Sequence, residues 1–452
     1  DPNLVSAAGL VPLMALARKA DLSVLAQERL SIAGDKGANA GAKISSLVAA
    51  MAAGADSIDD MALLRHGAMG KIFTRPYAPS TLGSFLRSFT FGHVRQGDAI
   101  ASRFLGKLAQ HADLLGDAAD TGPVMVDIDD TIIEVHGYAK QGAGFGYSGV
   151  RGLNALLATV SGASFSPVIA AQRLRKGSTG SPRGAQRLAT DTLALIKRTH
   201  LAGRAVLVRG DAAFYSQELV AACHKAGAQV SITVRMDPAI KRAIAAIAES
   251  AWETIKYTEA IFDEATGKWI SRAEVAEIDY TAFTSKKKAQ HIPGRLVVRR
   301  IPELNPKKDT GQGALFETWR FHAFFTTSST DERDTVVADQ VHRAHAIIEN
   351  VHADLKAGPL AHLPSGVFNA NAAWLVCAVM AFNLTRAAAT TTRAADLARA
   401  HTATIRRKLI NIPARVASSA RRLRLHLPTN WPWHQAWTNL YDHVLPARAP
   451  ST

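Results

Sequence analysis

The sequence has little cysteine and no long apolar run, and both absences narrow what the protein can be. Only two of its 452 residues are cysteines, Cys223 and Cys377. Two cysteines cannot build a disulfide framework or a cysteine-based zinc site, and such usage fits a reducing cytosol. The longest uninterrupted apolar run, residues 372–382, is too short to span a bilayer. We therefore expect a cytoplasmic protein that has no membrane partner.

Acidic residues are in the minority. The chain has 53 Lys and Arg against 38 Asp and Glu, which gives a net charge of +15 and a pI near 9.9. Residues 386–452 carry eleven of the basic residues and only two acids. Such an excess favours a polyanionic partner, nucleic acid or an anionic membrane face, although a basic enzyme without such a partner could have the same composition.

The apolar pattern changes along the chain and predicts five regions. Residues 1–120 have apolar positions at intervals of three and four, which predicts a helical N-terminal domain. Residues 121–236 read as three strands, helix, strand, helix and strand, the order of a ribonuclease H-like α/β core. Residues 237–327 read as a β-rich insertion, and residues 328–395 return to helices that complete the core. Residues 396–452 are expected to form a basic helical C-terminal region.

Acidic residues end two of the predicted buried strands. Asp127 and Asp129 lie two apart on one strand and share a face, whereas Asp130 points to the other face. Asp211 follows the apolar strand 205–208 in the same way. A carboxylate at such a place costs several kcal/mol unless it is paired or metal-bound, so the two strand ends suggest a shared cation site. Asp residues that cap helices or form turns are the alternative reading.

A third acid comes from a predicted helix. His342, His345, Glu349 and Lys356 follow one another at intervals of three, four and seven residues, which places them along one helix face. A buried face would not gather these side chains through packing preference. A solvated polar face is the alternative, and a zinc site made by the two His residues matches no familiar spacing.

These motifs resemble the signatures of bacterial insertion-sequence DDE transposases, in the subgroup that has a β-rich insertion within a ribonuclease H-like catalytic domain. The resemblance is carried by Asp127-Ile128-Asp129-Asp130-Thr131, by residues 209–215 (Arg-Gly-Asp-Ala-Ala-Phe-Tyr), and by Glu349-Asn350 with Asp354-Leu355-Lys356. Weaker similarity extends from Ala8 to Trp433. The family has Tyr and Arg where this sequence has His342 and His345.

The resemblance implies a DNA transposase that cuts and rejoins the strands of an insertion sequence. It implies that Asp129, Asp211 and Glu349 are catalytic and bind two Mg²⁺ (or Mn²⁺) ions. Asp127 would lie outside this ligand set and support the ligands without binding the metal itself. It also implies double-stranded DNA as the partner, both as terminal inverted repeats and as target, bound by a homodimer. Residues 1–120 would then bind the DNA ends, and the protein would be associated with the nucleoid.

Further side chains are predicted to contact this DNA. They come from the Glu349 helix, from a basic loop after the third strand, from the insertion and from two clusters in the tail. Trp319 would stack on a displaced base, although packing inside the insertion is an equal alternative. The predicted contacts are Lys356, His342, His345, Arg173, Arg175, Lys176, Trp319, Arg406, Arg407, Lys408, Arg421, Arg422 and Arg424.

Two other functions compete with this reading. Residues 127–131 also fit the nucleophile motif of haloacid-dehalogenase-like phosphatases, in which Asp127 would attack phosphorus and Asp129 would act as the acid. Those enzymes need a further Asp shortly after a Gly-Asp pair, but Asp211 is followed by residues 212–215, Ala-Ala-Phe-Tyr. A catalytically inactive DNA-binding protein is the second alternative, and three intact acids argue against it.

Overall fold

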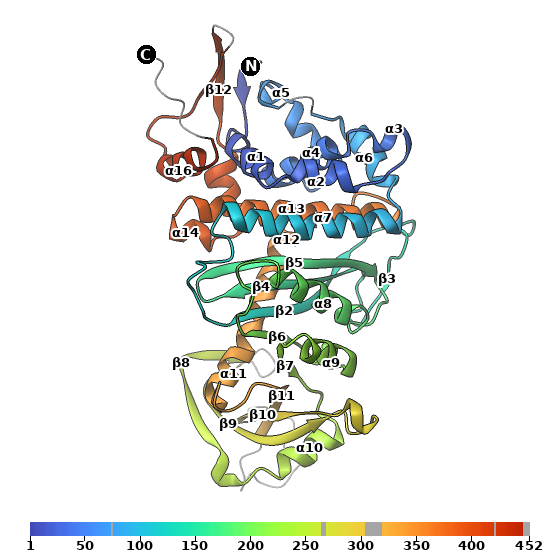
Figure 1. The fold of residues 1–452 in the computed structure, drawn as a ribbon, viewed down its shortest axis with the longest axis vertical. Coiled ribbons are helices and arrows are strands. Elements are labelled where there is room, and N and C mark those ends of the chain that lie inside the picture. Colours follow the sequence, from blue (N-terminus) through green and yellow to red (C-terminus); the bar gives the residue numbers. More distant parts are fainter. Residues whose placement is uncertain (74–75, 264–267, 303–318, 420–421, 446–452) are drawn as a thin grey trace.

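Figure 1 shows a computed structural model of the chain, which describes residues 1–73, 76–263, 268–302, 319–419 and 422–445. The molecule is elongated: helices from both ends of the chain form a layer at one end, strands cross the middle, and the insertion lies at the other end. The elements that hold the predicted acids therefore lie in the middle of the molecule.

Five strands form the core of the larger sheet. Their bounds are β2 (Val124–Glu134), β4 (Arg151–Gly162), β5 (Phe165–Lys176), β6 (Val206–Gly210) and β7 (Gln229–Thr233). β5, β4 and β2 pair antiparallel, and β6 and β7 follow in parallel with β2. Parallel neighbours need crossover connections, which here contain α8 (Ala185–Ile196) and α9 (Gln217–Lys225). This strand order is that of a ribonuclease H-like core and confirms the predicted α/β fold.

The insertion extends the same sheet. Its elements are α10 (Pro238–Ala245), β8 (Glu253–Asp263), β9 (Lys268–Ala282), β10 (Ile292–Pro302) and β11 (Trp319–Thr326). β11 pairs antiparallel with β7, with Phe324 opposite Thr233 and Phe325 opposite Ile232. Among the described residues the sheet has ten strands, in the order β3-β4-β2-β6-β7-β11-β10-β9-β8, with β5 beside β4 and β3 at Gly144–Phe145. The predicted strand-rich segment is therefore a continuation of the catalytic sheet.

One long helix, α13 (Phe368–Thr391), organises the helical layer. It packs against α7 (Phe91–His111), α4 (Ala40–Ala53) and β5, and the Asn383 side chain bonds both the N–H and the carbonyl of Ile169 on β5, at 2.9 and 2.8 Å. By length and composition α13 could cross a membrane, but its apolar stretch is completely buried within this protein. The burial identifies it as a core helix.

The N-terminal helices do not stand alone as a separate domain. They share one hydrophobic core with α13 and with the C-terminal helix α16, and β1 (Leu4–Val5) pairs with β12 from the C-terminal region. The predicted boundary near residue 120 therefore divides the chain, but the segments on its two sides share one hydrophobic core. The remaining helices are α1 (Leu10–Lys19), α2 (Leu22–Arg29), α3 (Gly34–Gly37), α5 (Met69–Ile72), α6 (Pro79–Arg87), α14 (Ala395–Ala398), α15 (Thr402–Ile405) and α16 (His434–Val444).

The tail contains a hairpin in addition to the helices that were predicted for the C-terminal region. A short π-helical turn, Arg406–Ile410, is followed by the antiparallel pair β12 (Ala414–Ser419) and β13 (Arg422–His426). In β12, Ala414 and Val416 are buried while their neighbours are exposed, which is the period-two pattern of a half-buried strand. Arg422 and Arg424, from one tail cluster, consequently lie on β13 of this hairpin.

Two helices bring the third predicted acid back to the sheet. α11 (Thr335–Arg343) and α12 (Ile347–Lys356) are separated by a 3₁₀ turn at Ala344–Ala346, and α12 packs against β2. Glu349 lies in the first turn of α12.

Candidate active site

Two of the predicted catalytic acids lie next to each other on neighbouring strands. β2 and β6 are parallel and Ile128 lies opposite Gly210, so Asp129 and Asp211 each come directly after the last residue pair between these strands. Asp211 follows the end of β6, whereas β2 continues to Glu134, so the prediction that a strand ends at Asp129 was wrong. The Asp211 carboxylate also accepts a hydrogen bond from the Ala213 N–H at 2.9 Å, which fixes the turn after β6. Both acids line an open cleft of 1240 Å³, together with Asp130, Arg235 and Lys356 among others.

Asp127 has a different environment. It is 1% exposed and does not line the cleft. The Arg209 guanidinium donates to both of its oxygens at 2.7 and 2.9 Å, and another of its nitrogens donates to the Val341 carbonyl at 2.5 Å. Burial raises the pKa of Asp127, and Arg209 opposes that rise. This buried pair ties β2 and β6 to α11, and it removes the free nucleophile that a phosphatase of the alternative class would need. The supporting role of Asp127 stays a prediction.

The acids at the cleft are crowded. The pKa of Asp211 is raised first by burial and then by the negative charge of Asp129, with a smaller contribution from Asp130. A cation bound between the carboxylates would relieve this repulsion, and carboxylate oxygens are the ligands that Mg²⁺ prefers. Within the described part of the chain no three His, Cys, Asp or Glu side chains already converge on one point. The site therefore offers an acid pair, to which α12 would have to add the third ligand.

α12 turns a polar face toward these acids. The Nε2 atom of His352 lies 3.5 Å from an Asp129 carboxylate oxygen, and Lys356 lines the cleft. Burial lowers the pKa of Lys356, and the charge of Asp129 opposes that shift. Glu349 is one helical turn before His352 on the same face; its side chain is exposed and is not among those lining the cleft. His352 was missed in the sequence, where the Glu-x-x-His spacing was the available signal.

The structure corrects the prediction that His342 contacts DNA. His342 is buried, and its ring nitrogens bond the Ser231 and Thr233 hydroxyls at 2.8 and 3.0 Å. Its ring stacks on Phe324 with a centroid separation of 4.0 Å. Burial lowers its pKa well below the usual range, so it is a neutral core residue. His345 is half-buried and near enough to Asp211 for its charge to act on the pKa of that carboxyl.

Arg175 also departs from its predicted role as a DNA contact. It is 6% exposed, and its guanidinium bonds the Asn154 side chain, the carbonyls of Ser181 and Arg183, and the Asp130 carboxylate. These bonds hold the 177–182 loop, which lines the cleft. Arg175 therefore shapes the site from inside the protein.

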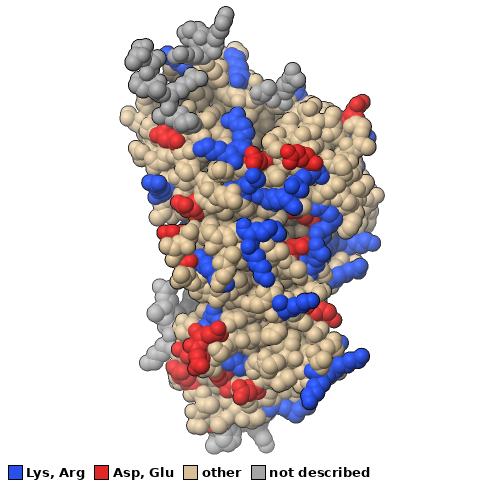
Figure 2. All heavy atoms as spheres, in the orientation of Figure 1, with Lys and Arg blue, Asp and Glu red and all other residues tan. Residues whose placement is uncertain are grey.

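Arg173 lies in a basic groove instead. The groove has a volume of 190 Å³ and lies between α7, β5 and α8. Lys and Arg side chains gather across this middle region in Figure 2. Two acids, Asp98 and Asp191, lie among the arginines, whereas Lys176 is exposed near the end of β5. Sequence reasoning missed Arg95, Arg103 and Arg198 because they lie far from Arg173 in the sequence. The arginines of the groove are Arg95, Arg103, Arg173, Arg187 and Arg198.

Trp319 is half-buried in the insertion. The Arg300 guanidinium lies 4.5 Å from the Trp319 ring centroid and 4.3 Å from that of Trp252, so it is held between the two indoles. This is the packing alternative stated for Trp319. Base stacking by Trp319 remains a prediction, and the Arg300 side chain would have to leave one face of the ring for a base on that side.

The predicted tail contacts divide by exposure. Arg407 and Arg424 are exposed, whereas burial lowers the pKa of Arg406. Lys408 pairs with Asp396 at 3.2 Å. Arg422 lies on β13, and Arg421 lies outside the described residues. Phosphate contact by these residues remains a prediction.

The chain is similar to known proteins over most of its length. Residues 2–449 match a family model described as "Transposase DDE domain group 1". No curated protein matches the chain. Among solved structures, it is similar to the cryo-EM structure of the piggyBac transposase synaptic complex with hairpin DNA. That similarity has 10% sequence identity and a TM-score of 0.43, and it covers 88% of this chain and 79% of the other.

Proposed function

The chain belongs to the DDE transposases, which cut and join DNA strands and use divalent metal ions, and we propose that Asp129, Asp211 and Glu349 form its metal-binding active site. The observation that carries this proposal is the pair of carboxylates on neighbouring strands at the cleft, where burial and then the charge of Asp129 raise the pKa of Asp211. Crowded acids of this kind are stabilised by a divalent cation.

Glu349 is the third ligand in this proposal. Its support is its place on α12, where His352 on one side of the same helix face approaches Asp129 and Lys356 lines the same cleft. A rotation of the exposed Glu349 side chain, or a small shift of α12 against β2, would bring its carboxylate toward the acid pair. DNA or metal binding would supply the energy for that adjustment.

Two Mg²⁺ ions held there would activate a water or a 3′ hydroxyl and stabilise the leaving oxygen of the phosphodiester. The protein's own groups place the DNA. Lys356 bears its ammonium at the cleft and is positioned to bind a phosphate beside the acids. Arg175, through Asp130 and the loop carbonyls, keeps one cleft wall in place. Strand hydrolysis and strand joining would then use the same site in turn.

The proposed DNA substrates are the inverted repeats at the ends of an insertion sequence and a target duplex, bound by a homodimer that holds two ends together. The basic groove between α7 and α8 would take part of the duplex backbone, since arginine guanidinium groups match phosphate geometry. The tail residues Arg407 and Arg424 would extend that contact.

The test is a cleavage reaction with the purified protein, Mg²⁺ and duplexes that carry the element's own flanking ends, followed by strand mapping. Wild type should nick at the element ends and yield joined product. Asp129→Ala, Asp211→Ala and Glu349→Ala should each lower cleavage by about 10²-fold or more, because a metal site contributes several kcal/mol to the transition state.

DNA binding by the three variants, followed by gel shift, should stay close to wild type because phosphate contacts come mainly from Lys and Arg. A variant that cleaves at the wild-type rate removes its residue from the proposed site. Loss of both binding and cleavage, with an altered circular dichroism spectrum, would instead mark that residue as structural.

A further inference from the structure

His352 occupies a place that packing does not explain. It lies in α12 with 6% of its surface exposed. The other buried residues of the helix are Ile348, Val351 and Leu355, which are apolar, and Asp354, which accepts hydrogen bonds from Thr402. Among the described residues, neither of its ring nitrogens has a hydrogen-bond partner. A buried polar group without a partner costs about 1–3 kcal/mol, a cost that an apolar side chain would avoid. The imidazole is therefore expected to have a function that offsets this cost.

The nearest charged group points to that function. The His352 Nε2 atom lies 3.5 Å from an Asp129 carboxylate oxygen, slightly beyond a good hydrogen bond. Asp129 is 28% exposed and lines the cleft, whereas the His352 side chain is 7% exposed behind it. A small rotation of either side chain brings the N–H and the carboxylate into bonding distance. One carboxylate oxygen of Asp129 would then bond to His352, and the other would face the cleft.

We propose that His352 is a positioning residue, which fixes the Asp129 carboxylate by donating from Nε2 and thereby prepares it to bind metal. This inference rests on the proposed active site. Groups that hydrogen-bond a metal ligand orient it, and their loss typically weakens metal binding by about 10–100-fold.

The same contact ties the third acid to the pair. His352 and Glu349 are three residues apart on α12, and Asp129 is on β2, against which α12 packs. A bond from His352 to Asp129 therefore sets the position of α12 on the strand, and with it the position of Glu349. The helix that carries the third acid would be aligned by a residue that itself binds neither metal nor DNA.

The test measures Mn²⁺ binding by electron paramagnetic resonance of free Mn²⁺, with the full-length protein and no DNA. His352→Leu removes the donor but keeps an apolar side chain of similar size, and it should weaken Mn²⁺ binding by about 10–100-fold. His352→Gln carries an amide nitrogen near the Nε2 position and should bind Mn²⁺ nearly as wild type does. The thermal midpoint of His352→Leu should stay close to that of wild type, because the leucine exchanges one hydrogen bond for apolar contacts of similar size.

A matched control is available in His362, whose Nδ1 atom also lies 3.5 Å from an aspartate, Asp56, but whose side chain is 68% exposed. His362→Leu should leave Mn²⁺ binding unchanged. Wild-type Mn²⁺ binding by a folded His352→Leu variant would overturn the inference. If that variant does not fold, His352→Asn replaces it: the Asn amide is too short to reach Asp129, so equal binding by the Asn and Gln variants would also overturn it.

Asp129→Asn separates this inference from the proposed active site. If Asp129→Asn weakens Mn²⁺ binding but His352→Leu does not, the proposed metal site is supported and the proposed role of His352 is wrong. If Asp129→Asn binds Mn²⁺ as wild type does, the proposed metal site itself is wrong.

Discussion

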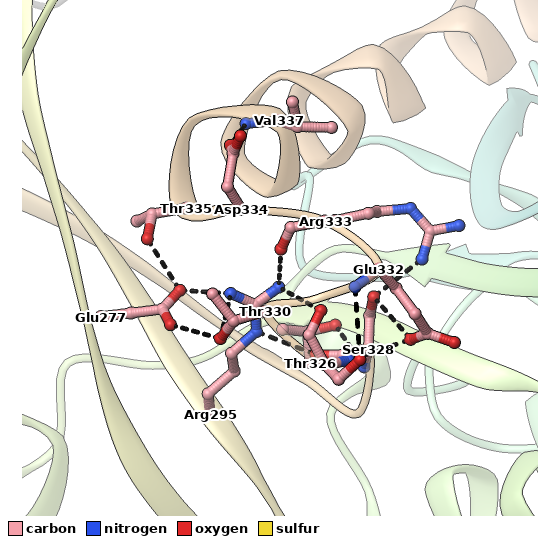
Figure 3. A network of polar contacts seen from close by, with 11 residues as sticks. Glu277, Arg295, Thr326, Ser328, Thr330, Glu332, Arg333, Asp334, Thr335 and Val337 are labelled. Carbon is pink, nitrogen blue, oxygen red and sulfur yellow. Dashed lines mark hydrogen bonds and ion pairs between the residues drawn. The ribbon is translucent and has the colours of Figure 1, made fainter.

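Acidic side chains in the insertion and acidic side chains at the cleft, two parts of the same large sheet, have opposite environments. In the insertion, Arg295 is 5% exposed and its guanidinium donates to Glu277 and to the carbonyls of Ser328, Ser329 and Arg333. Figure 3 shows this network, in which Glu277 also accepts from the Thr330 and Thr335 hydroxyls. At the cleft, Asp129 and Asp211 repel each other instead.

The difference distinguishes acids that stabilise the fold from acids that can bind metal. A carboxylate that is saturated by guanidinium and hydroxyl donors has no further need of a cation, so the Glu277 network joins β9 and β10 to the start of α11. The same contrast holds within β2, where Asp127 is bound by Arg209 while Asp129 faces the cleft. The unneutralised acids that line the cleft are the ones expected to bind metal.

The largest expected effect is on the free energy of unfolding and should come from breaking the Arg295–Glu277 network. Arg295→Leu leaves Glu277 and three carbonyls without their donor, and loss of one partner of a buried pair costs about 3–5 kcal/mol. Urea denaturation should show that loss, while the cleavage rate per folded molecule stays near wild type. Lys287→Leu, on the exposed turn after β9, is the control and should change neither quantity. A large fall in cleavage without a fall in stability would show that the insertion end also serves the chemistry.

A smaller effect on stability concerns pH. The pKa of Asp98, in the basic groove, is raised to about 6 because burial outweighs the charges of Arg173 and Arg95. The unfolded value is near 3.8, so between these pH values the folded protein holds a proton that the unfolded chain has lost. This group therefore stabilises the fold below about pH 4, and that contribution is lost as pH rises to about 6. The loss is about 3 kcal/mol in total.

Asp98→Asn removes this dependence. The stability of the variant relative to wild type should therefore increase from pH 4 to pH 7, as measured by urea midpoints across that range. A difference that stays constant with pH would show that Asp98 is ionised throughout and that its arginine partners outweigh burial.

The smallest expected effect compares two basic surfaces. Arg103 and Arg198 lie in the groove and are exposed, and replacing both by Ser should flatten the slope of log affinity against log salt by roughly two units if both bind phosphates. Replacing Arg421, Arg422 and Arg424 by Ser should flatten it by roughly two to three units if that tail cluster binds DNA. Both changes should act alike on specific and random duplexes. An unchanged slope for either set would assign that surface to packing or to contact between protomers.

Local patterns predicted a large part of this fold. The apolar runs before Asp129 and Asp211 lie in strands, and because β2 and β6 pair in parallel the two acids lie next to each other. The helix that carries Glu349 followed from its spacing, although the 3₁₀ turn at Ala344–Ala346 interrupts it. Patterns of this kind lie within single elements, which is why they can be read from one sequence.

Pairings between distant segments could not be predicted. Arg209 reaches Asp127 from 82 residues away, and no local pattern separates a paired aspartate from an open one two residues later. His342 looked like part of a polar helix face because its hydroxyl partners lie on β7, more than a hundred residues before it. The groove arginines could not be predicted together for the same reason, since they come from α7, β5, α8 and the residues after α8, which meet only in the fold.

The most direct test of the account compares the two aspartates of β2 in one assay. Mg²⁺-dependent cleavage of the element's own ends is measured per folded molecule for Asp129→Asn and for Asp127→Asn. The Asp127→Asn change is combined with Arg209→Gln so that no buried charge is left unpaired. We expect Asp129→Asn to fold and lose cleavage, whereas the Asp127 double variant should be less stable but still cleave. A folded Asp127 variant without cleavage, beside an active Asp129→Asn, would contradict the assignment of metal binding to the open acid.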